Sequence, residues 1–97
     1  MTFAVKLSPV IVKQLGALDE KSKRVVWEKI KQIDQNPFRF KKIHSKSFRK
    51  VFRVRMSIQH KETRLIYVVL EPNILIVCLL ERKKDYKDLE KYLAKIT

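Results

Sequence analysis

The pattern of hydrophobic and polar positions divides the first part of the chain into short elements. Residues 2–7 alternate apolar with polar or small side chains, which predicts a strand with one buried face. Ser8 and Pro9 follow as a helix N-cap and a first helical residue, and Gly16 is suited to end this short helix. A strand and a helix in direct succession are therefore expected.

A longer helix is predicted to follow. Asp19 can cap its N-terminus, and the Asn-Pro pair that ends with Pro37 stops it. Its inner stripe consists of Val26, Ile30 and Ile33, spaced i, i+4 and i+7, with charged residues at most other positions. Two helices with so short a connection are expected to pack as an antiparallel hairpin.

The second half of the chain is rich in strand patterns. Residues 38–47 show no period and are interpreted as a basic loop. An alternating strand is predicted over residues 49–57, and residues 63–70 and 74–80 are nearly continuous apolar runs, typical of central strands. The polar residues 71–73 between these runs predict a turn. The three strands are therefore expected to form an antiparallel meander.

A final helix is predicted beyond Asp85, with Tyr86, Leu89, Leu93 and Ile96 along one stripe. The predicted order is a strand, a helical hairpin, a three-stranded meander and a C-terminal helix. This order is typical of an α+β sandwich, and the length of 97 residues suits one domain that spans residues 1–97.

The two faces of the predicted sheet differ in character. Arg53 and Arg55 alternate on one face and lie roughly 7 Å apart along the strand. If the loop to the next strand has an even number of residues, Arg55 faces Arg64, and the two positive charges repel each other unless an anion lies between them. The terminal helix is expected to cover the apolar part of this face, and the helical hairpin the opposite face. The residues expected on the hairpin side are Phe52, Val54, Leu65 and Tyr67, and those under the terminal helix are Ile66, Val68 and Leu70.

Basic residues outnumber acidic ones, with 23 Lys and Arg against 10 Asp and Glu and a formal net charge of +13. Between Asp34 and Glu62 there is no acidic residue. A solvated loop and a polar strand face would explain a run of charge, but the helices pair their charges and this stretch does not. We therefore expect a polyanion as partner, with RNA favoured. The nine basic residues of the stretch are Arg39, Lys41, Lys42, Lys46, Arg49, Lys50, Arg53, Arg55 and Lys61.

Several classes of function are disfavoured by composition. Cys78 is the only cysteine and lies in an apolar run, which predicts a buried, inert thiol and no Cys-based metal site. His44 and His60 have no partner at the spacing of metal ligands, and no glycine-rich phosphate loop is present. No apolar stretch reaches the ~18 residues that span a bilayer, and the N-terminal residues lack a signal-peptide pattern. A cytoplasmic protein without metal, cofactor or membrane contact is expected.

Three short motifs resemble those of a known family. They are RVRMS at residues 53–57, RLIYV at residues 64–68 and LLERKKDY at residues 79–86. Together with the helical hairpin, they resemble the second half of RelE/ParE-superfamily toxins of type II toxin–antitoxin systems. The resemblance implies a RelE-like, microbial-ribonuclease type of sandwich. It also implies a metal-independent endoribonuclease that cuts mRNA in the ribosomal A site, where the 2′-hydroxyl attacks the adjacent phosphate.

The resemblance also implies roles for individual residues and for partners. Arginines would stabilise the charge that develops on the phosphate, and Tyr86 would stack on a base or pass a proton. A cognate acidic antitoxin and mRNA on the ribosome are the implied partners. The implied catalytic residues are Arg53, Arg55, Arg64, Arg82 and Tyr86, and the implied RNA-binding residues are Lys41, Lys42, Lys46, Arg49, Lys50 and Lys83.

Two departures from the family pattern leave other functions open. Glu81 stands where many relatives have histidine and would add negative charge beside the phosphate site. Both basic positions of the second strand are arginine, which is a poor general base, and the remaining candidates for proton transfer are Tyr86, Lys83, Lys50, Glu81, His44 and His60. The alternatives are a ParE-like inhibitor of DNA gyrase and a catalytically weakened, RNA-binding relative.

Overall fold

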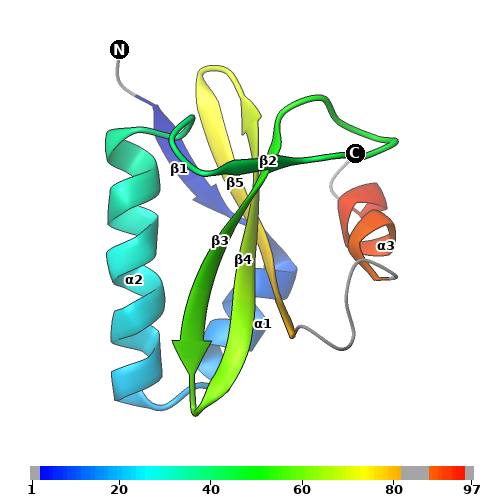
Figure 1. Cartoon of the computed structure of the whole chain (residues 1–97). Coiled ribbons are helices and arrows are strands. Elements are labelled where there is room, and N and C mark those ends of the chain that lie inside the picture. The colour runs from blue at the N-terminus through cyan, green and yellow to red at the C-terminus, as the bar shows by residue number, and fades with distance from the viewer. Residues whose placement is uncertain (1–2, 82–87, 96–97) are drawn as a thin grey trace.

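A twisted sheet of five strands runs through the centre of the molecule, with helices on both of its faces (Figure 1). This computed structural model describes residues 3–81 and 88–95. The strands are ordered β1-β5-β4-β3-β2, and β1 is parallel to β5 whereas the other neighbours are antiparallel. The elements are β1 (Ala4–Leu7), α1 (Pro9–Gly16), α2 (Glu20–Gln35), β2 (Lys41–Ile43), β3 (Val51–Ile58), β4 (Lys61–Leu70), β5 (Asn73–Glu81) and α3 (Leu89–Ala94).

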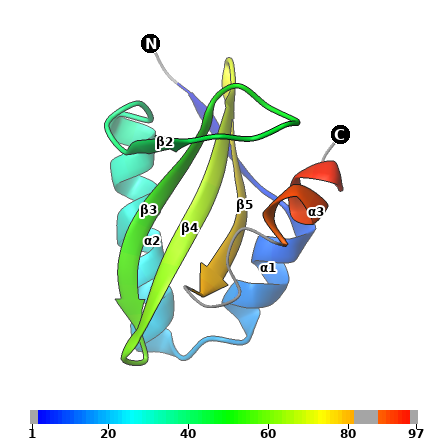
Figure 2. The same cartoon turned by 45° about the vertical axis from the view of Figure 1, so that its right-hand side comes forward.

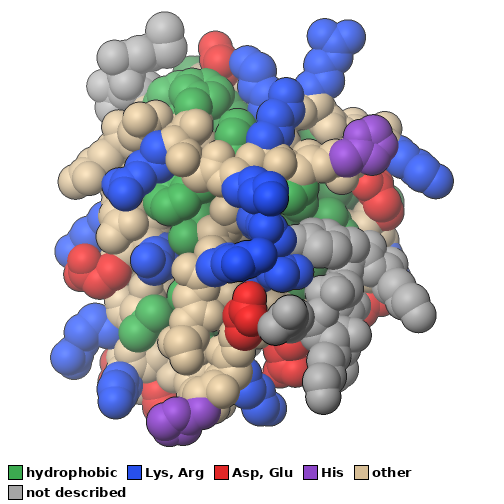
Figure 3. Space-filling model, viewed as in Figure 1, with side chains coloured by type: hydrophobic (Ala, Val, Ile, Leu, Met, Phe, Trp, Pro, Cys, Tyr) green, Lys and Arg blue, Asp and Glu red, His purple; other side chains and the backbone are tan. Residues whose placement is uncertain are grey.

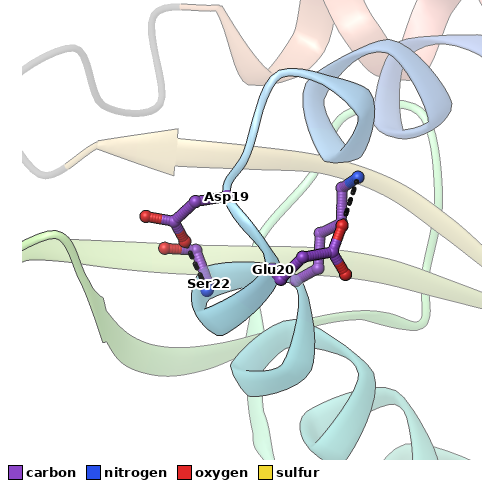
Figure 4. A network of polar contacts seen from close by, with 4 residues as sticks. Asp19, Glu20 and Ser22 are labelled. Atoms are coloured by element: carbon purple, nitrogen blue, oxygen red, sulfur yellow. Dashed lines mark hydrogen bonds and ion pairs between the residues drawn. The ribbon is translucent and has the colours of Figure 1, made fainter.

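The start of α2 is held by the cap that the sequence predicts. Asp19 Oδ1 accepts a hydrogen bond of 2.7 Å from the backbone N–H of Ser22, and Glu20 forms an ion pair of 3.4 Å with Lys23 (Figure 4). The hydrogen bond from the Ser22 backbone holds the pKa of Asp19 below its ordinary value. The helix ends at Gln35, directly before Asn36 and Pro37, because proline cannot continue it.

The first hydrophobic core lies between the sheet and helices α1 and α2, which run in roughly opposite directions (Figure 2). This confirms that the helical hairpin buries the predicted sheet face. The helices contribute five buried residues, and β3, β4 and β5 contribute the remainder. The helical members are Ile11, Leu15, Val26, Ile30 and Ile33, and the four predicted sheet members Phe52, Val54, Leu65 and Tyr67 are all present.

The second core lies on the opposite face of the sheet and includes the terminal helix. Leu89 and Leu93 of α3 are buried there together with Ile66, Val68 and residues of β5. This confirms that α3 covers the apolar part of the face. Leu70 was expected in the same core, but its side chain is 41% exposed because it lies at the last position of β4.

Beyond the end of β1, two polar side chains form hydrogen bonds with the backbone of β5. The buried hydroxyl of Ser8 accepts from the backbone N–H of Ile11 and donates to the carbonyl of Val77. The side-chain amide of Gln14 donates to the carbonyl of Leu79 at 2.9 Å and accepts from its N–H at 2.6 Å. These bonds satisfy backbone groups of β5 that lie beyond the residues paired with β1 in the described sheet.

The structure corrects the prediction of a basic loop over residues 38–47. Residues Lys41–Ile43 form the edge strand β2, so the antiparallel meander has four strands in place of three. A strand of three residues is too short to show a period, and its hydrogen bonds come from β3. At the other end, α3 begins at Leu89, and the predicted cap Asp85 lies outside the described residues, as do Tyr86 and Ile96.

The double role of Ser8 predicts a measurable loss of stability on truncation. Ser8→Ala removes the cap of α1 and leaves the buried carbonyl of Val77 without its hydroxyl partner, so we expect a loss of about 2 kcal/mol. Chemical denaturation of the two proteins measures it. The matched control is Ser57→Ala at an exposed position, expected to change stability by less than about 0.5 kcal/mol. Equal effects of the two substitutions would contradict the role of Ser8.

The buried thiol of Cys78 predicts slow chemical labelling. Burial raises the pKa of Cys78 to about 12, and the thiol lies in the core that α3 covers. At neutral pH, we expect a thiol reagent to react with the native protein slower by about a hundredfold or more than in denaturant. Leu93→Ala, in α3, should speed labelling more than Val26→Ala in the opposite core. If both substitutions speed it equally, α3 does not open independently.

Candidate nucleic-acid interface

The turn between β3 and β4 sets the positions of the arginines. It consists of Gln59 and His60, whose φ angles are 53° and 64°, as a tight two-residue hairpin requires. The loop has an even number of residues, so the condition for the register considered from the sequence is met, and Arg55 lies directly opposite Arg64. Arg53 lies opposite Ile66 and Phe52 opposite Tyr67, also as predicted.

Among the described residues, the carboxylate of Glu62 lies near both opposed arginines. Glu62 Oε1 is 3.9 Å from Arg55 Nε and 3.9 Å from Arg64 Nη2, which is the long limit of an ion pair. The two guanidinium groups differ in access, because the side chain of Arg55 is 60% exposed whereas that of Arg64 is 9% exposed. Glu62 thus reduces the repulsion within the pair while Arg55 stays accessible to a phosphate.

Lys41 and Lys42 are neighbours in the sequence, but in edge strand β2 they lie on opposite faces of the sheet. Lys41 is the partner of Arg53 and Lys42 the partner of Phe52, and partners across a ladder share a face. Lys41 therefore joins the arginine face, and Lys42 lies on the side of the helical hairpin. Figure 3 shows that Lys and Arg side chains gather over β2 and the adjoining part of β3.

The loop after β2 is fastened to the terminal helix. Glu90 of α3 accepts hydrogen bonds of 2.9 Å from the backbone N–H of Lys46 and from the hydroxyl of Ser47. Burial alone would raise the pKa of Glu90, but these hydrogen bonds outweigh it and hold the pKa below its ordinary value. The side chains of Lys46 and Arg49 are left exposed to solvent. The backbone of this basic loop is thereby held against α3.

Lys50 was expected to bind RNA, but its ammonium group already has a carboxylate partner. Its Nζ forms an ion pair of 2.9 Å with Glu71 in the turn between β4 and β5 and lies 5.7 Å from the ring centre of Phe38. An ammonium that already has a carboxylate partner at this distance contributes less to a phosphate site. Lys50 is therefore a weaker member of the interface than the sequence suggests.

Aromatic rings anchor the segment between α2 and β2. The buried hydroxyl of Tyr67 donates to the carbonyl of Pro37, and its ring stacks on Phe52 with centroids 5.3 Å apart. The ring of Phe40 meets that of Tyr67 edge-on at 6.4 Å, and the guanidinium of Arg39 lies 5.1 Å from the Phe40 centroid. These contacts fix the backbone that carries Arg39 to the edge of the sheet.

Three predicted site residues, Arg82, Lys83 and Tyr86, lie outside the described residues. Glu81, which was expected to add negative charge beside the arginines, is the partner of Thr63 on the other face of the sheet. Its carboxylate is 3.9 Å from Lys61 Nζ. The concern that Glu81 would repel a phosphate is therefore wrong, because strand alternation directs it away from Arg64.

The described residues indicate which kinds of ligand the site suits. His44 and His60 are exposed, and no three His, Cys, Asp or Glu residues within 3–81 and 88–95 are grouped to hold a metal ion. None of the helices in the same part has the length and apolar character needed to cross a bilayer. The arrangement offers fixed positive charge from guanidinium groups, which suits the binding of phosphates.

Reasoning from sequence missed three features of the interface. Glu62 and Glu90 hold the arginine pair and the basic loop, and neither contact has a signal in the local sequence. The third is Arg39, whose position depends on the aromatic contacts described above. A clustering of aromatic residues around Pro37 was the only available hint, since Phe38 and Phe40 flank Arg39.

Comparisons with known proteins add a structural relative. No protein-family model and no curated protein sequence matches the chain. A solved structure of the E. coli toxin RelE, a mutant in the free state, is similar over 100% of both chains with a TM-score of 0.74. This chain has a RelE fold. The sequence identity of 12% explains why sequence comparison alone finds no relative, and the RelE fold agrees with the predicted α+β sandwich.

The hydrogen bonds of Glu90 predict a pH-dependent contact. Because the pKa of Glu90 in the folded protein lies below its ordinary value of 4.5, the contact is present at neutral pH and is lost as the pH falls through the folded pKa. We expect the amide resonance of Lys46 to titrate with a midpoint below 4.5. Glu90→Gln should abolish this titration, and Glu28→Gln should leave it unchanged. A midpoint above the ordinary value would contradict the contact.

Proposed function

We propose that this protein is the toxin of a toxin–antitoxin system and that it inhibits translation by cutting mRNA on the ribosome. The observation that carries the proposal is the pair of opposed residues Arg55 and Arg64, beside Arg53, on one face of the sheet in a RelE fold. Guanidinium groups that converge in this way provide charge and hydrogen-bond donors for a phosphate. Glu62 Oε1 lies 3.9 Å from Arg55 Nε and from Arg64 Nη2, and a phosphate can compete for contacts of this length.

The proposed reaction needs few groups from the protein. The 2′-oxygen of a ribose attacks the adjacent phosphorus, the bond to the 5′-oxygen breaks, and a cyclic phosphate and a 5′-hydroxyl result. Negative charge grows on the phosphate oxygens as the new bond forms. Arg55 and Arg64 would stabilise that charge, a contribution that is often the largest in such reactions. Sequence resemblance adds Arg82 to this group, and Tyr86 as a residue that stacks on a base.

The groups that would transfer protons in this reaction decide between the nuclease and a second candidate function. The 2′-hydroxyl must lose a proton and the 5′-oxygen must gain one. Arginine does not release its proton near neutral pH, and Lys50 is paired with Glu71. Glu81 lies on the other face of the sheet, so Lys83, Tyr86, His44 and His60 remain for this role. If none of them serves, the protein inhibits translation by occupying RNA without cutting it, which is the second candidate.

An acidic antitoxin is the proposed protein partner. A formal net charge of +13 favours fast, salt-sensitive association with an acidic chain. Such a chain would neutralise the arginine face and compete with RNA for the same guanidinium groups. Lys41, Lys46 and Arg49, all exposed, extend the surface available to either partner.

The decisive experiment uses translating ribosomes, the purified protein and primer extension on the mRNA. We expect new mRNA ends at the A-site codon, and we expect Arg55→Ala to reduce their rate of appearance by about a hundredfold. Arg55 is exposed, so its truncation should leave the fold intact. The matched control is Arg24→Ala, on the side of α2 that faces away from the sheet, which should cut at the rate of the original protein.

Other experimental outcomes would support a different function for the protein. Arrest of translation without new mRNA ends supports the RNA-binding candidate. Inhibition of DNA gyrase with no effect on translation would exclude both and support the ParE-like alternative. Equal loss of cutting in Arg55→Ala and Arg24→Ala would show that the arginine face is not the site.

A further inference from the structure

A basic cleft of about 480 Å³ lies between α2 and the edge of β3. Five of its seven lining residues are cationic, and none of the seven is acidic. They come from four consecutive segments of the chain, namely α2, the segment before β2, β2 itself and β3. The lining residues are Lys29, Arg39, Phe40, Lys41, Arg53, Val54 and Arg55.

The cleft exists because β2 is much shorter than β3. Strand β2 pairs only with residues Val51, Phe52 and Arg53, whereas β3 continues to Ile58. From Val54 onward no strand of the described chain pairs with β3 on that side, and α2 forms the opposite wall of the cleft. The open edge exposes backbone donors and acceptors next to the cationic side chains.

Protection of the strand edge is the simplest explanation for positive charge there. Proteins often place one or two charged side chains at an open edge to prevent pairing with another chain. The cleft gathers five cations, and Glu62, which lies 3.9 Å from Arg55, is not among its lining residues. Five cations go beyond the need of edge protection, because like charges repel each other and lower stability. An anion that normally occupies the cleft would remove this cost.

The guanidinium of Arg39 is held in position at the cleft. It lies over the ring of Phe40, and Phe40 packs in the first core against Tyr67. The backbone of Lys41 is held by its pairing with Arg53 in the β2–β3 ladder. A cation that is already held loses little side-chain entropy when it binds a phosphate chain.

The cleft is continuous with the arginine face. Arg53 and Arg55 belong to both, since they border the cleft and also lie beside Arg64 on the sheet. A single chain of phosphates can therefore pass from the sheet face around the open edge of β3 to Lys29 on α2. Along this route, the backbone positions of Arg53 and Arg55 are roughly 7 Å apart.

We propose that this cleft binds the sugar-phosphate backbone of single-stranded RNA next to the phosphate on the arginine face. The inference deepens the proposed function and rests on it for the identity of the nucleic acid. Binding at the cleft is independent of base sequence, because its cations contact phosphates and not base edges. It lengthens the RNA segment held by the protein without adding a group to the reaction.

The test measures the affinity of the protein for free RNA by fluorescence anisotropy. The probes are an oligouridylate of about 12 nucleotides and one of about 3 nucleotides. The variant Lys29→Ala with Arg39→Ala removes two cleft cations. Its matched control, Lys21→Ala with Arg24→Ala, removes the same charge from exposed positions at the start of α2.

We expect the cleft variant to bind the longer RNA about tenfold more weakly, and the control to lose less than about twofold. The slope of log affinity against log salt should fall by roughly 1.4 in the cleft variant, or about 0.7 for each lost contact. The shorter RNA should bind equally to both variants. Arg39→Lys should recover most of the affinity lost by Arg39→Ala, because it retains the charge.

The failures of the two proposals are distinguishable. If ribosomal mRNA is not cut but the cleft variant still loses affinity for the longer RNA, the proposed nuclease activity fails and the cleft proposal stands. If mRNA is cut but cleft variant and control bind RNA equally, the cleft proposal is overturned. It is also overturned if the original protein binds no free RNA, or if the cleft variant loses affinity only for an acidic peptide such as polyglutamate.

Discussion

In the pairing of β3 with β4, a two-residue turn decides which side chains are buried and which reach solvent. A shift of this register by one position would move Phe52 and Tyr67 out of the first core and bring arginines into it. The aromatic contacts that hold the segment before β2 would be lost in the same step. Both the interior of the protein and its candidate interface therefore depend on one pairing register.

The same register concentrates positive charge on a face that is partly apolar. Arg64 is almost fully buried, and Arg55 lies opposite it, an arrangement that costs stability unless negative charge lies nearby. Within the described residues Glu62 reduces this cost, and two further carboxylates stabilise other basic parts of the chain. Glu62 lies between the arginines, Glu90 holds the basic loop, and Glu71 pairs with Lys50. Each is close enough to stabilise the free protein, and exposed enough for a stronger anion to compete.

Helix α3 connects the second core to the interface. Its buried face packs on the sheet through Leu89 and Leu93, and Glu90 between them holds the backbone of the basic loop. A partner that moves α3 would therefore expose apolar surface and release the loop at the same time. Among the described residues, the first core combines two helices with the sheet, whereas the second is covered by the six-residue helix α3 together with side chains such as Val10 and Phe48.

Local pattern determined much of the fold. The alternation in β3, the helical stripe of α2 and the caps at Ser8 and Asp19 act over a few residues, so they are legible in the sequence and are confirmed. The register of β3 and β4 was conditional on the parity of the turn, and the two-residue turn of the structure selects the register in which Arg55 meets Arg64.

Other features were decided only by the tertiary structure. The three residues of β2 are a strand because β3 provides their hydrogen bonds, and the sequence alone does not specify this neighbour. The positions of Glu62, Glu81 and Glu90 relative to the basic groups depend on which face and which segment lie nearby in space. The basic cleft also depends on the tertiary structure. It lies where β3 continues beyond the end of β2, and α2 lines its other side. Short-range pattern therefore determined the elements, and long-range packing determined where their charges meet.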